Sequence, residues 1–316
     1  MTFEQLRIFL AVADFLHFTR AAEALYITQP AVSAAIQSLE AKYGVKLFHR
    51  TGRNTQITDA GKLLQIEAQK ILEQVALTER GLRELNNMQQ GELKLGSSLT
   101  IGNYWLPSKI SQFKHQYPGI SVNCTLGNAE EICEGTAIGL FDLGLVTGEV
   151  KASVQNCLRQ KFVGSLYAER LAVRYRLQIV VGKSHSWYKL KEISPEALLT
   201  TTWVMRESGS GAQQVFEQAL QSWGIDPTQL NIVLVLNSSE MVKTVVESGV
   251  GAAAIPELMV KNELKLSTLH AVQVIDREKG SGTKLEIIQP VWKLKHIQRF
   301  QTRAASAFEV ILNQGF

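Results

Sequence analysis

The sequence has few cysteines, little net charge and no long apolar run. Three cysteines in 316 residues form no complete disulfide framework and indicate a reducing compartment. No apolar stretch reaches the length of a membrane span. The first residues already carry the charged side chains of an amphipathic helix, so we expect no secretory signal peptide. These features predict a cytoplasmic protein without a membrane partner.

Bulk charge gives no sign of a nucleic-acid partner. The formal net charge is +4, and residues 1–60 hold six Lys and Arg against five Asp and Glu, a net of +1. An enzyme is also disfavoured, because the sequence contains no metal-ligand spacing, nucleophile elbow or phosphate-binding glycine loop. At 316 residues and 45% hydrophobic content, the chain should form two or three globular domains.

Residues 28–43 are predicted to form a helix with two different faces. Thr28 is a good N-cap, and Pro30 is tolerated in the first helical turn. Apolar residues recur at helical spacing on one face: Val32, Ile36, Leu39 and Tyr43. The other face carries short, uncharged side chains: Gln29, Pro30, Ser33, Ala34 and Gln37. Such a face suits the major groove, where Gln reads adenine and Ser bonds base edges, although an ordinary surface helix has the same pattern.

The flanking residues favour a DNA-binding role over an ordinary surface helix. Two helices, at Phe3–Ala13 and Phe18–Leu25, precede the helix that follows the short turn Tyr26–Thr28, which is helix-turn-helix spacing. Small residues at Ala21 and Ala22 would let the second and third helices cross closely.

Residues 46–58 contain a Thr-Gly-Arg-Asn turn between two short extended segments. This pattern predicts a wing that carries Lys46, Arg50 and Arg53 toward DNA phosphates. The expected DNA-binding residues are Thr28, Gln29, Pro30, Ser33, Ala34, Gln37, Arg50 and Arg53.

Together these motifs resemble the N-terminal signature of LysR-type transcriptional regulators. The resemblance rests on Phe18-Thr-Arg-Ala-Ala22, Ile27-Thr-Gln-Pro-Ala-Val-Ser33, Leu39-Glu40, Leu47-Phe48 and Ile57-Thr-Asp-Ala-Gly61. It implies a sequence-specific regulator that binds a roughly palindromic promoter site on double-stranded DNA. It also implies a homodimer or homotetramer, a small-molecule effector and contact with RNA polymerase.

Residues 59–88 are predicted to form one long linker helix. Its apolar positions alternate spacings of four and three, which indicates a coiled-coil-like pairing with a second copy. The alternative is a helix packed within its own chain. The seam comprises Leu64, Ala68, Ile71, Val75, Thr78, Leu82 and Leu85.

Beyond residue 88, strand and helix patterns alternate, which predicts an α/β effector domain with largely parallel sheets. The fold class is therefore α+β multidomain: a winged helix-turn-helix (1–58), a linker helix (59–88) and an effector domain (89–316). The family resemblance implies two lobes similar to periplasmic binding proteins. We place lobe I at about 89–164 and 270–316 and lobe II at about 165–269, with crossings near Ser165 and His270.

Two hydroxyl-rich, Gly-containing stretches, 96–103 and 206–213, each lead into a predicted helix. Free N–H groups at a helix start favour an anion, although simple helix capping explains the same residues. The resemblance implies that both stretches are effector-binding loops. The expected effector-binding residues are Ser97, Ser98, Leu99, Thr100, Asn103, Asn128, Thr147, Ser208, Gly209, Ser210 and Gln213.

The second loop departs from the family pattern. It reads Gly209-Ser-Gly-Ala-Gln213, whereas the family usually has Gly-Ser-Gly-Thr-Arg, so one candidate guanidinium for a carboxylate is missing. Arg174, Arg176 or Arg206 could replace it. The stretches Thr100–Pro107 and Leu126–Asn128 resemble the family branch that governs sulfur assimilation and senses sulfite. The expected effector is an inorganic oxyanion or a small carboxylate, with no cofactor and no metal.

Two alternatives remain at this point. Cys124 and Cys133 lie nine residues apart, and some members of the family sense peroxide through a cysteine pair. Their predicted places in a core strand and the next helix favour structural thiols instead. A solute-binding receptor would resemble the two lobes but would need an export signal and would not need the first 88 residues.

Overall fold

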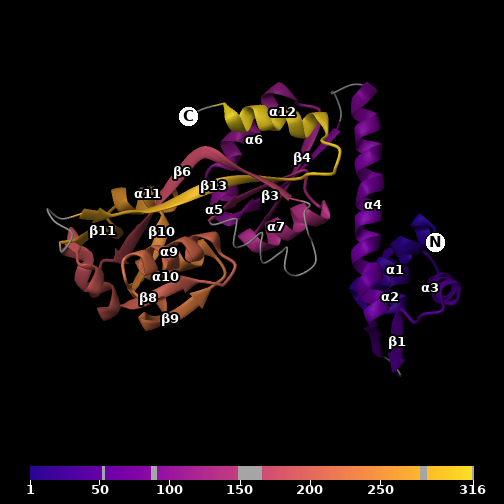
Figure 1. The fold of residues 1–316 in the computed structure, drawn as a ribbon, viewed down its shortest axis with the longest axis horizontal. Coiled ribbons are helices and arrows are strands. Elements are labelled where there is room, and N and C mark those ends of the chain that lie inside the picture. Colours follow the sequence, from indigo (N-terminus) through magenta and orange to yellow (C-terminus); the bar gives the residue numbers. More distant parts are fainter. Residues whose placement is uncertain (52–53, 87–90, 149–165, 278–282, 315–316) are drawn as a thin grey trace. The chain divides into compact units, whose positions relative to one another are not determined.

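The computed structural model describes residues 1–51, 54–86, 91–148, 166–277 and 283–314 (Figure 1). The chain forms two compact units, residues 1–82 and 83–316. Within the described ranges, no helix is both long enough and apolar enough to span a membrane.

Three short helices form the core of the first unit. They are α1 (Phe3–Phe15), α2 (Phe18–Ala24) and α3 (Gln29–Tyr43). Each begins where a side chain accepts a backbone N–H: Thr2 for α1, His17 for α2 and Thr28 for α3. Ala21 and Ala22 are buried, as close helix crossing requires. The core also contains Leu6, Phe9, Val12, Phe18, Val32, Ile36 and Leu39.

Two aromatic residues at the ends of these helices are exposed, and one of them, Tyr43, was expected on the buried face of α3. Phe3 is 52% exposed and Tyr43 is 49% exposed. Phe3 is the first residue of α1 and Tyr43 the last of α3, so both lie beyond the turns that pack together.

The predicted wing is present as an antiparallel hairpin of β1 (Phe48–Thr51) and β2 (Asn54–Ile57). The helix α4 (Asp59–Asn86) follows it directly. A Cβ atom at Gly61 would lie 2.3 Å from the Leu47 carbonyl oxygen, so only glycine lets α4 approach the wing this closely.

The first part of α4 packs within its own chain. Ala68 is fully buried in the helix-turn-helix core, and Leu64 packs against the same core. Ile71 and Leu82 are exposed. The heptad seam therefore divides: its first residues belong to the first unit's core, whereas these two later residues remain accessible to a partner.

The second unit is built on one 11-stranded sheet whose main path runs β4-β3-β5-β13-β6-β10-β8-β9. The three strands β4, β3 and β5 are parallel, as expected for the first lobe. The strands are β3 (Gly91–Ser98), β4 (Ile120–Gly127), β5 (Leu143–Thr147), β6 (Leu166–Gly182), β7 (Glu192–Ile193), β8 (Thr202–Arg206), β9 (Asn231–Leu236), β10 (Ala252–Pro256), β11 (Leu269–Asp276), β12 (Thr283–Leu285) and β13 (Ile287–His296).

Helices cover both faces of this sheet (Figure 1). In the first lobe, α6 and α12 pack on one face and α7 on the other. The helices are α5 (Leu99–Tyr104), α6 (Leu106–Gln116), α7 (Ala129–Ile138), α9 (Gly211–Ser222), α10 (Ser239–Glu247), α11 (Glu257–Lys265) and α12 (Arg303–Asn313). Three short 3-10 helices are η1 (Ser186–Lys189), η2 (Pro195–Thr200) and η3 (Pro227–Gln229).

Two consecutive helices, α5 and α6, follow β3. The chain becomes helical at Leu99 and breaks at Trp105, and α6 then begins at Leu106. Pro107 lacks an N–H donor and is tolerated only in a first turn, so the helix restarts there.

The two lobes share the strands β6 and β13. Tyr175 of β6 belongs to the first lobe's core, and Leu177 to the second lobe's core. On the return, Ile287 of β13 lies in the second core and Val291 in the first. The cores thus change within paired strands, further along the chain than the expected crossings. The reason is that β6 is one strand that runs through both lobes.

The β6–β13 pairing is interrupted at this change of core. The register shifts between Pro290 and Trp292, and Pro290 stands opposite Arg174. Proline has no N–H to donate to the ladder, which weakens the pairing locally.

Candidate DNA-binding and effector-binding sites

The outward face of α3 carries the predicted base-reading residues. Thr28, Gln29, Pro30, Ala34 and Gln37 are exposed, and Ser33 is half-buried. The opposite face is buried in the helix-turn-helix core. The sequence-predicted division of this helix into two faces is therefore observed, with the exception of Tyr43.

Gln29 and Ser33 are ordered by a contact within the helix. The Gln29 Nε2 amide donates to Ser33 Oγ over 2.8 Å. One N–H and the carbonyl oxygen of Gln29 remain available, and these are the groups that pair with an adenine edge.

One carboxylate ties the end of α3 to the wing. Glu40 accepts hydrogen bonds from Lys46 Nζ at 2.7 Å and from the Leu47 N–H at 2.9 Å. A longer bond of 3.4 Å comes from the Phe48 N–H. Burial raises the pKa of Glu40, but these hydrogen bonds and the charge of Lys46 outweigh burial and hold the pKa below its usual value.

The cations predicted on the wing differ in their contacts. Lys46 was expected to face phosphates, but its ammonium group is paired with Glu40. Arg50 lies on β1, and Arg53 lies outside the described residues.

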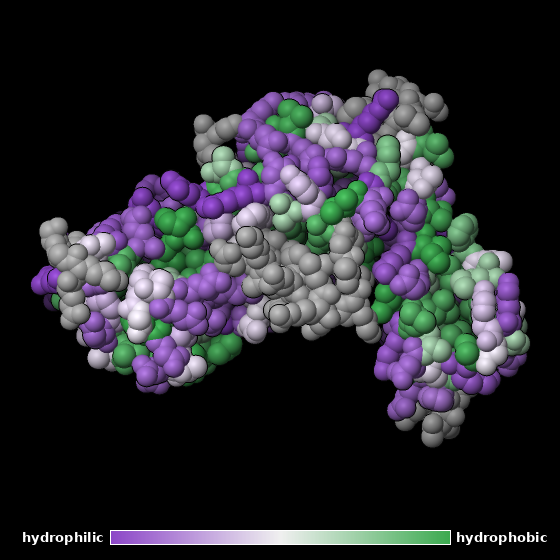
Figure 2. Space-filling view, viewed as in Figure 1, coloured by the Kyte–Doolittle hydropathy of each residue, from purple (hydrophilic) through white to green (hydrophobic). Residues whose placement is uncertain are grey.

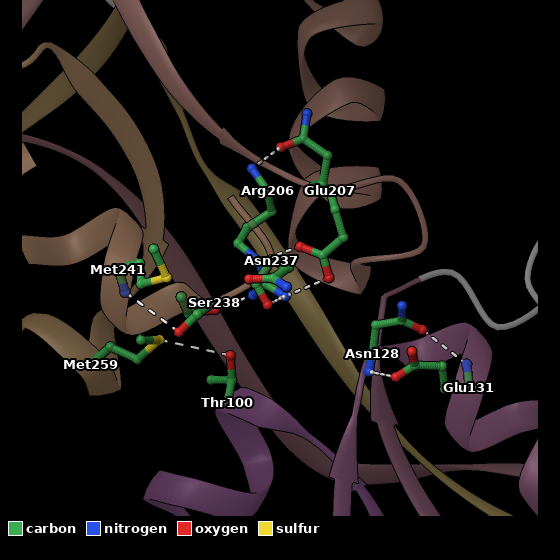
Figure 3. Close-up of polar contacts among 11 residues, drawn as sticks. Thr100, Asn128, Glu131, Arg206, Glu207, Asn237, Ser238, Met241 and Met259 are labelled. Atoms are coloured by element: carbon green, nitrogen blue, oxygen red, sulfur yellow. Dashed lines mark hydrogen bonds and ion pairs between the residues drawn. The ribbon is translucent and has the colours of Figure 1, made fainter. Parts of the chain in front are cut away.

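Predicted effector-binding residues from both lobes come together where parallel strands end. Ser97 and Ser98 end β3, Thr147 ends β5, and Ser210 follows β8; all four are buried. Thr100 Oγ1 lies 3.8 Å from the sulfur of Met259, a residue of the second lobe (Figure 3). The carboxyl ends of parallel strands are the usual ligand position in open α/β sheets.

The lobes approach each other closely at two glycines. A Cβ atom at Gly211 would lie 1.8 Å from the Thr147 carbonyl oxygen, so α9 begins directly against the end of β5. A Cβ atom at Gly209 would lie 3.4 Å from the Asn128 amide nitrogen. The loop before α9 is therefore set against two predicted site residues of the first lobe.

Several predicted effector residues have structural contacts of their own. Asn128 forms a capping box with Glu131 at the start of α7, with bonds of 2.8 and 2.9 Å (Figure 3). Gln213 accepts from the Arg206 N–H at 3.1 Å and donates to Glu217 at 2.8 Å. Of the remaining predicted residues, Leu99 is half-buried, Gly209 is buried, and Asn103 and Ser208 are exposed.

The candidate replacement arginines also differ. The Arg206 guanidinium is held by both carboxylate oxygens of Glu207, at 2.7 and 2.8 Å, and by Ser239 (Figure 3). Arg176 lies 3.6 Å from Glu286. Arg174 has no ion-pair partner among the described residues.

A polar clasp joins the lobes beside these loops. The Tyr104 hydroxyl of α5 donates to Glu240 of α10, and Lys243 lies 2.9 Å from Glu240 and 2.8 Å from Glu263. Burial alone would lower the pKa of Lys243, but hydrogen bonds to Glu263 and Glu240 raise it, so the lysine remains charged.

Several buried polar groups near the lobe junction have no hydrogen-bond partner in the described structure. They include Ser98 Oγ, the Tyr175 hydroxyl and the Gln289 amide. Tyr175 and Gln289 are cross-strand partners, so their side chains share a face of the sheet. Neither was predicted as a site residue. A lone amide inside the apolar run Ile287–Val291 was the signal for Gln289.

The two cysteines do not form a pair. Cys124 was expected in a core strand but is exposed, because β4 is an edge strand. It stands opposite Leu95, whose side chain faces the α6–α12 side of the sheet. Cys133 is buried on α7, on the other face. A disulfide needs Cα atoms within about 7 Å, which the intervening sheet prevents.

This fold is that of a LysR-type transcriptional regulator, and the chain belongs to that family. Residues 3–62 match the bacterial regulatory helix-turn-helix protein of the lysR family. Residues 86–315 match the LysR substrate binding domain. The protein is therefore a DNA-binding regulator with an effector-binding domain, and not an enzyme.

The chain is similar to relatives named as probable RuBisCO transcriptional regulators. The protein of Synechocystis sp. is 34% identical over 307 residues, 97% of this chain and 84% of the relative. That of Cyanophora paradoxa is 36% identical over 267 residues, 84% of this chain and 80% of the relative. These names give no support to the resemblance to the sulfur-assimilation branch.

The fold is shared with CbnR crystallised with its target DNA. That structure has a TM-score of 0.70 and 20% sequence identity, and the match covers 99% of both chains. The structure of a full-length OxyR variant from Pseudomonas aeruginosa matches with a TM-score of 0.64 and 20% identity, covering 100% of this chain and 99% of that chain.

Proposed function

We propose that α3 reads an operator in the major groove, with Gln29, Pro30, Ser33, Ala34 and Gln37 at base edges. The observation that carries this proposal is the exposure of these side chains on a helix whose other face is buried. Thr28, Arg50 and Arg53 would contact phosphates and set the register on the duplex. Residues 1–58 would then act as the DNA-binding domain, 59–88 as the dimerisation helix and 89–316 as the effector domain.

Self-association would use α4 and the β9 edge of the large sheet. On α4, Ile71 and Leu82 are exposed. On edge strand β9, Ile232, Val233 and Val235 are exposed, and apolar surface is visible over β9 (Figure 2). Exposed apolar edge strands are rarely left uncovered. A dimer would place two recognition helices about one DNA turn apart on a roughly palindromic operator, and a tetramer would join two such dimers.

The effector would be a small anion, either an inorganic oxyanion or a small carboxylate, held by hydroxyl and backbone N–H donors. Ser98 Oγ and the Gln289 amide are buried without partners, whereas Arg206 is already neutralised by Glu207. This arrangement favours hydrogen bonds over a guanidinium pair. Binding between the lobes would change the separation of the DNA-binding domains.

The relatives suggest the regulated genes. Because they are named for RuBisCO, the RuBisCO genes of the same organism are the first promoter to test. The protein would act in the cytoplasm and contact RNA polymerase there.

Two variants separate base reading from phosphate contact in fluorescence-anisotropy titrations. Gln29→Ala should reduce the preference for operator over scrambled duplex, by about 1–3 kcal/mol for one lost base contact. Arg53→Ala should weaken binding to both duplexes and reduce the salt slope by about one.

The matched control is Gln56→Ala, an exposed amide on strand β2 that is not expected at a base edge. If Gln29→Ala and Arg53→Ala change operator and scrambled binding equally, the proposed roles are wrong.

A further inference from the structure

A cavity separate from the predicted effector loops lies between strand β6 and helix α11. Its volume is about 600 Å³, within the range of small-molecule sites. Its walls come from residues 172–175 and 178 of β6 and from residues 257, 258, 261, 264 and 265 of α11. Not one of the predicted effector-binding residues lines it.

Three cations line this cavity: Arg174 of β6 and Lys261 and Lys265 of α11. The lysines are one helical turn apart and therefore lie on the same side of α11. None of the three forms an ion pair with a residue in the described ranges. Among the lining residues, the acid is Glu257, which leaves a net charge of three minus one, or +2.

The three side chains are exposed, whereas several other cations near the lobe junction are paired. Arg206 is bound by Glu207, Arg176 lies near Glu286, and Lys243 contacts two glutamates. Cations gathered around a cavity without carboxylate partners create a positive potential that attracts anions.

Two polar atoms of the lining residues are also buried without partners: the Tyr175 hydroxyl and the Gln178 carbonyl oxygen. Tyr175 is 5% exposed. Burial and the nearby Glu257 raise the pKa of Tyr175, so its hydroxyl stays protonated and can donate. Buried polar groups in proteins are nearly always hydrogen-bonded, so each of these atoms lacks an expected partner.

We propose that this cavity is a second ligand site, for a hydroxylated organic anion that carries phosphate or carboxylate. The cations would hold the anionic group, and the Tyr175 hydroxyl, which lies on the other face of β6 from Arg174, would donate to another part of the ligand. Gln178 and Glu257 would accept from the ligand's hydroxyls, and Leu258 and Leu264 would contact its carbon skeleton.

The cavity lies where a bound ligand could affect the arrangement of the two lobes. Tyr175 belongs to the first lobe's core, whereas Gln178 and α11 lie at the second lobe. A ligand that contacts both lobes stabilises one arrangement of the lobes over others. It would therefore shift the regulator's conformational equilibrium independently of the effector loops.

The test is calorimetric titration of the full-length protein with glucose 6-phosphate and with citrate, with glucose as the uncharged control. We expect at least one of the two anions to bind and glucose to give no heat. Arg174→Gln should weaken anion binding about tenfold or more, and Tyr175→Phe should weaken it several-fold.

Arg170→Gln is the matched control variant. Arg170 is exposed on the same strand and the same face as Arg174, but it does not line the cavity. Its loss should leave anion affinity unchanged. Equal weakening by both substitutions, or no heat with either anion, would overturn the second site.

A cleft variant distinguishes this site from the effector loops. If Ser98→Ala abolishes anion binding while Arg174→Gln has no effect, the anion binds at the loops. That result overturns the second site and leaves the proposed function intact. If the wild-type protein shows no preference for operator over scrambled duplex, the proposed function is wrong and the second site is unaffected.

Discussion

At the scale of single residues, Glu40 connects helix α3 to the wing. Its carboxylate receives two backbone N–H groups of the wing and the ammonium group of Lys46. The same side chain belongs to α3, so the reading helix and the wing are held in one geometry. A contact that fixes two DNA-facing elements influences both stability and binding.

Glu40→Gln should lower the free energy of unfolding by about 1–2 kcal/mol at neutral pH, because the charge-assisted bonds are lost. The measurement is urea denaturation followed by circular dichroism. Glu23→Gln, at an exposed position on α2, is the control and should be neutral. An equal stability for both variants would contradict this role for Glu40.

The contribution of Glu40 also depends on pH. Its folded pKa is lower than the usual 4.5, so its stabilisation is fully present above that value. It is lost as the pH falls from 4.5 through the lowered folded pKa. The stability difference between wild type and Glu40→Gln should therefore shrink below pH 4.5.

Sequence alone could assign some site residues and not others, and the difference has a physical cause. The exposed face of α3 was predictable because helical spacing is local. The bonds that occupy Gln213 and Arg206 were not, because they depend on where β8 ends against α9 and α10. The sequence did not identify Tyr175 or Gln289 as site residues, because each occupies a strand position whose pattern predicts a core residue.

At the scale of elements, α4 combines two surfaces in one helix. Its start is fixed by Thr58, whose hydroxyl accepts the Gly61 N–H over 2.9 Å, and by Ala68 in the helix-turn-helix core. Its later seam residues Ile71 and Leu82 remain exposed. The periodic pattern predicted one continuous seam but could not show that the first positions are already covered within the chain.

Leu82→Glu should weaken self-association about tenfold or more, because a charge would be buried in the paired seam. Sedimentation equilibrium of the full-length protein measures this. Gln69→Glu is the control, since helical spacing places Gln69 on the side of α4 that faces away from the seam. An unchanged association constant for Leu82→Glu would exclude α4 as the dimer interface.

At the scale of the whole effector domain, the lobes are joined by more than their crossing strands. Tyr104 of the first lobe bonds Glu240 of the second, and Lys243 completes the clasp. Thr100 and Met259 meet beside it. The alternation of strand and helix patterns predicted the α/β class of this domain, but the contacts between lobes join residues more than a hundred positions apart.

Tyr104→Phe should loosen this contact, because a hydrogen bond to a charged group contributes about 1.5–3 kcal/mol. Hydrogen–deuterium exchange should become faster in α5 and α10 while the sheet cores stay protected. Tyr117→Phe is the control, since Tyr117 stacks on Phe113 in the first lobe. Identical exchange in the two variants would show that the clasp does not hold the lobes.

The single unbroken strand β6 limits how the effector domain can respond to a ligand. Seventeen consecutive residues run from one core into the other, beside a partner strand whose ladder is interrupted at Pro290. Sliding one lobe past the other would require that strand to slip its register on both sides at once. Twisting about its axis requires only small changes at each residue. An effector that changes the arrangement of the lobes should therefore twist β6 about its axis and leave its register with β13 and β10 unchanged.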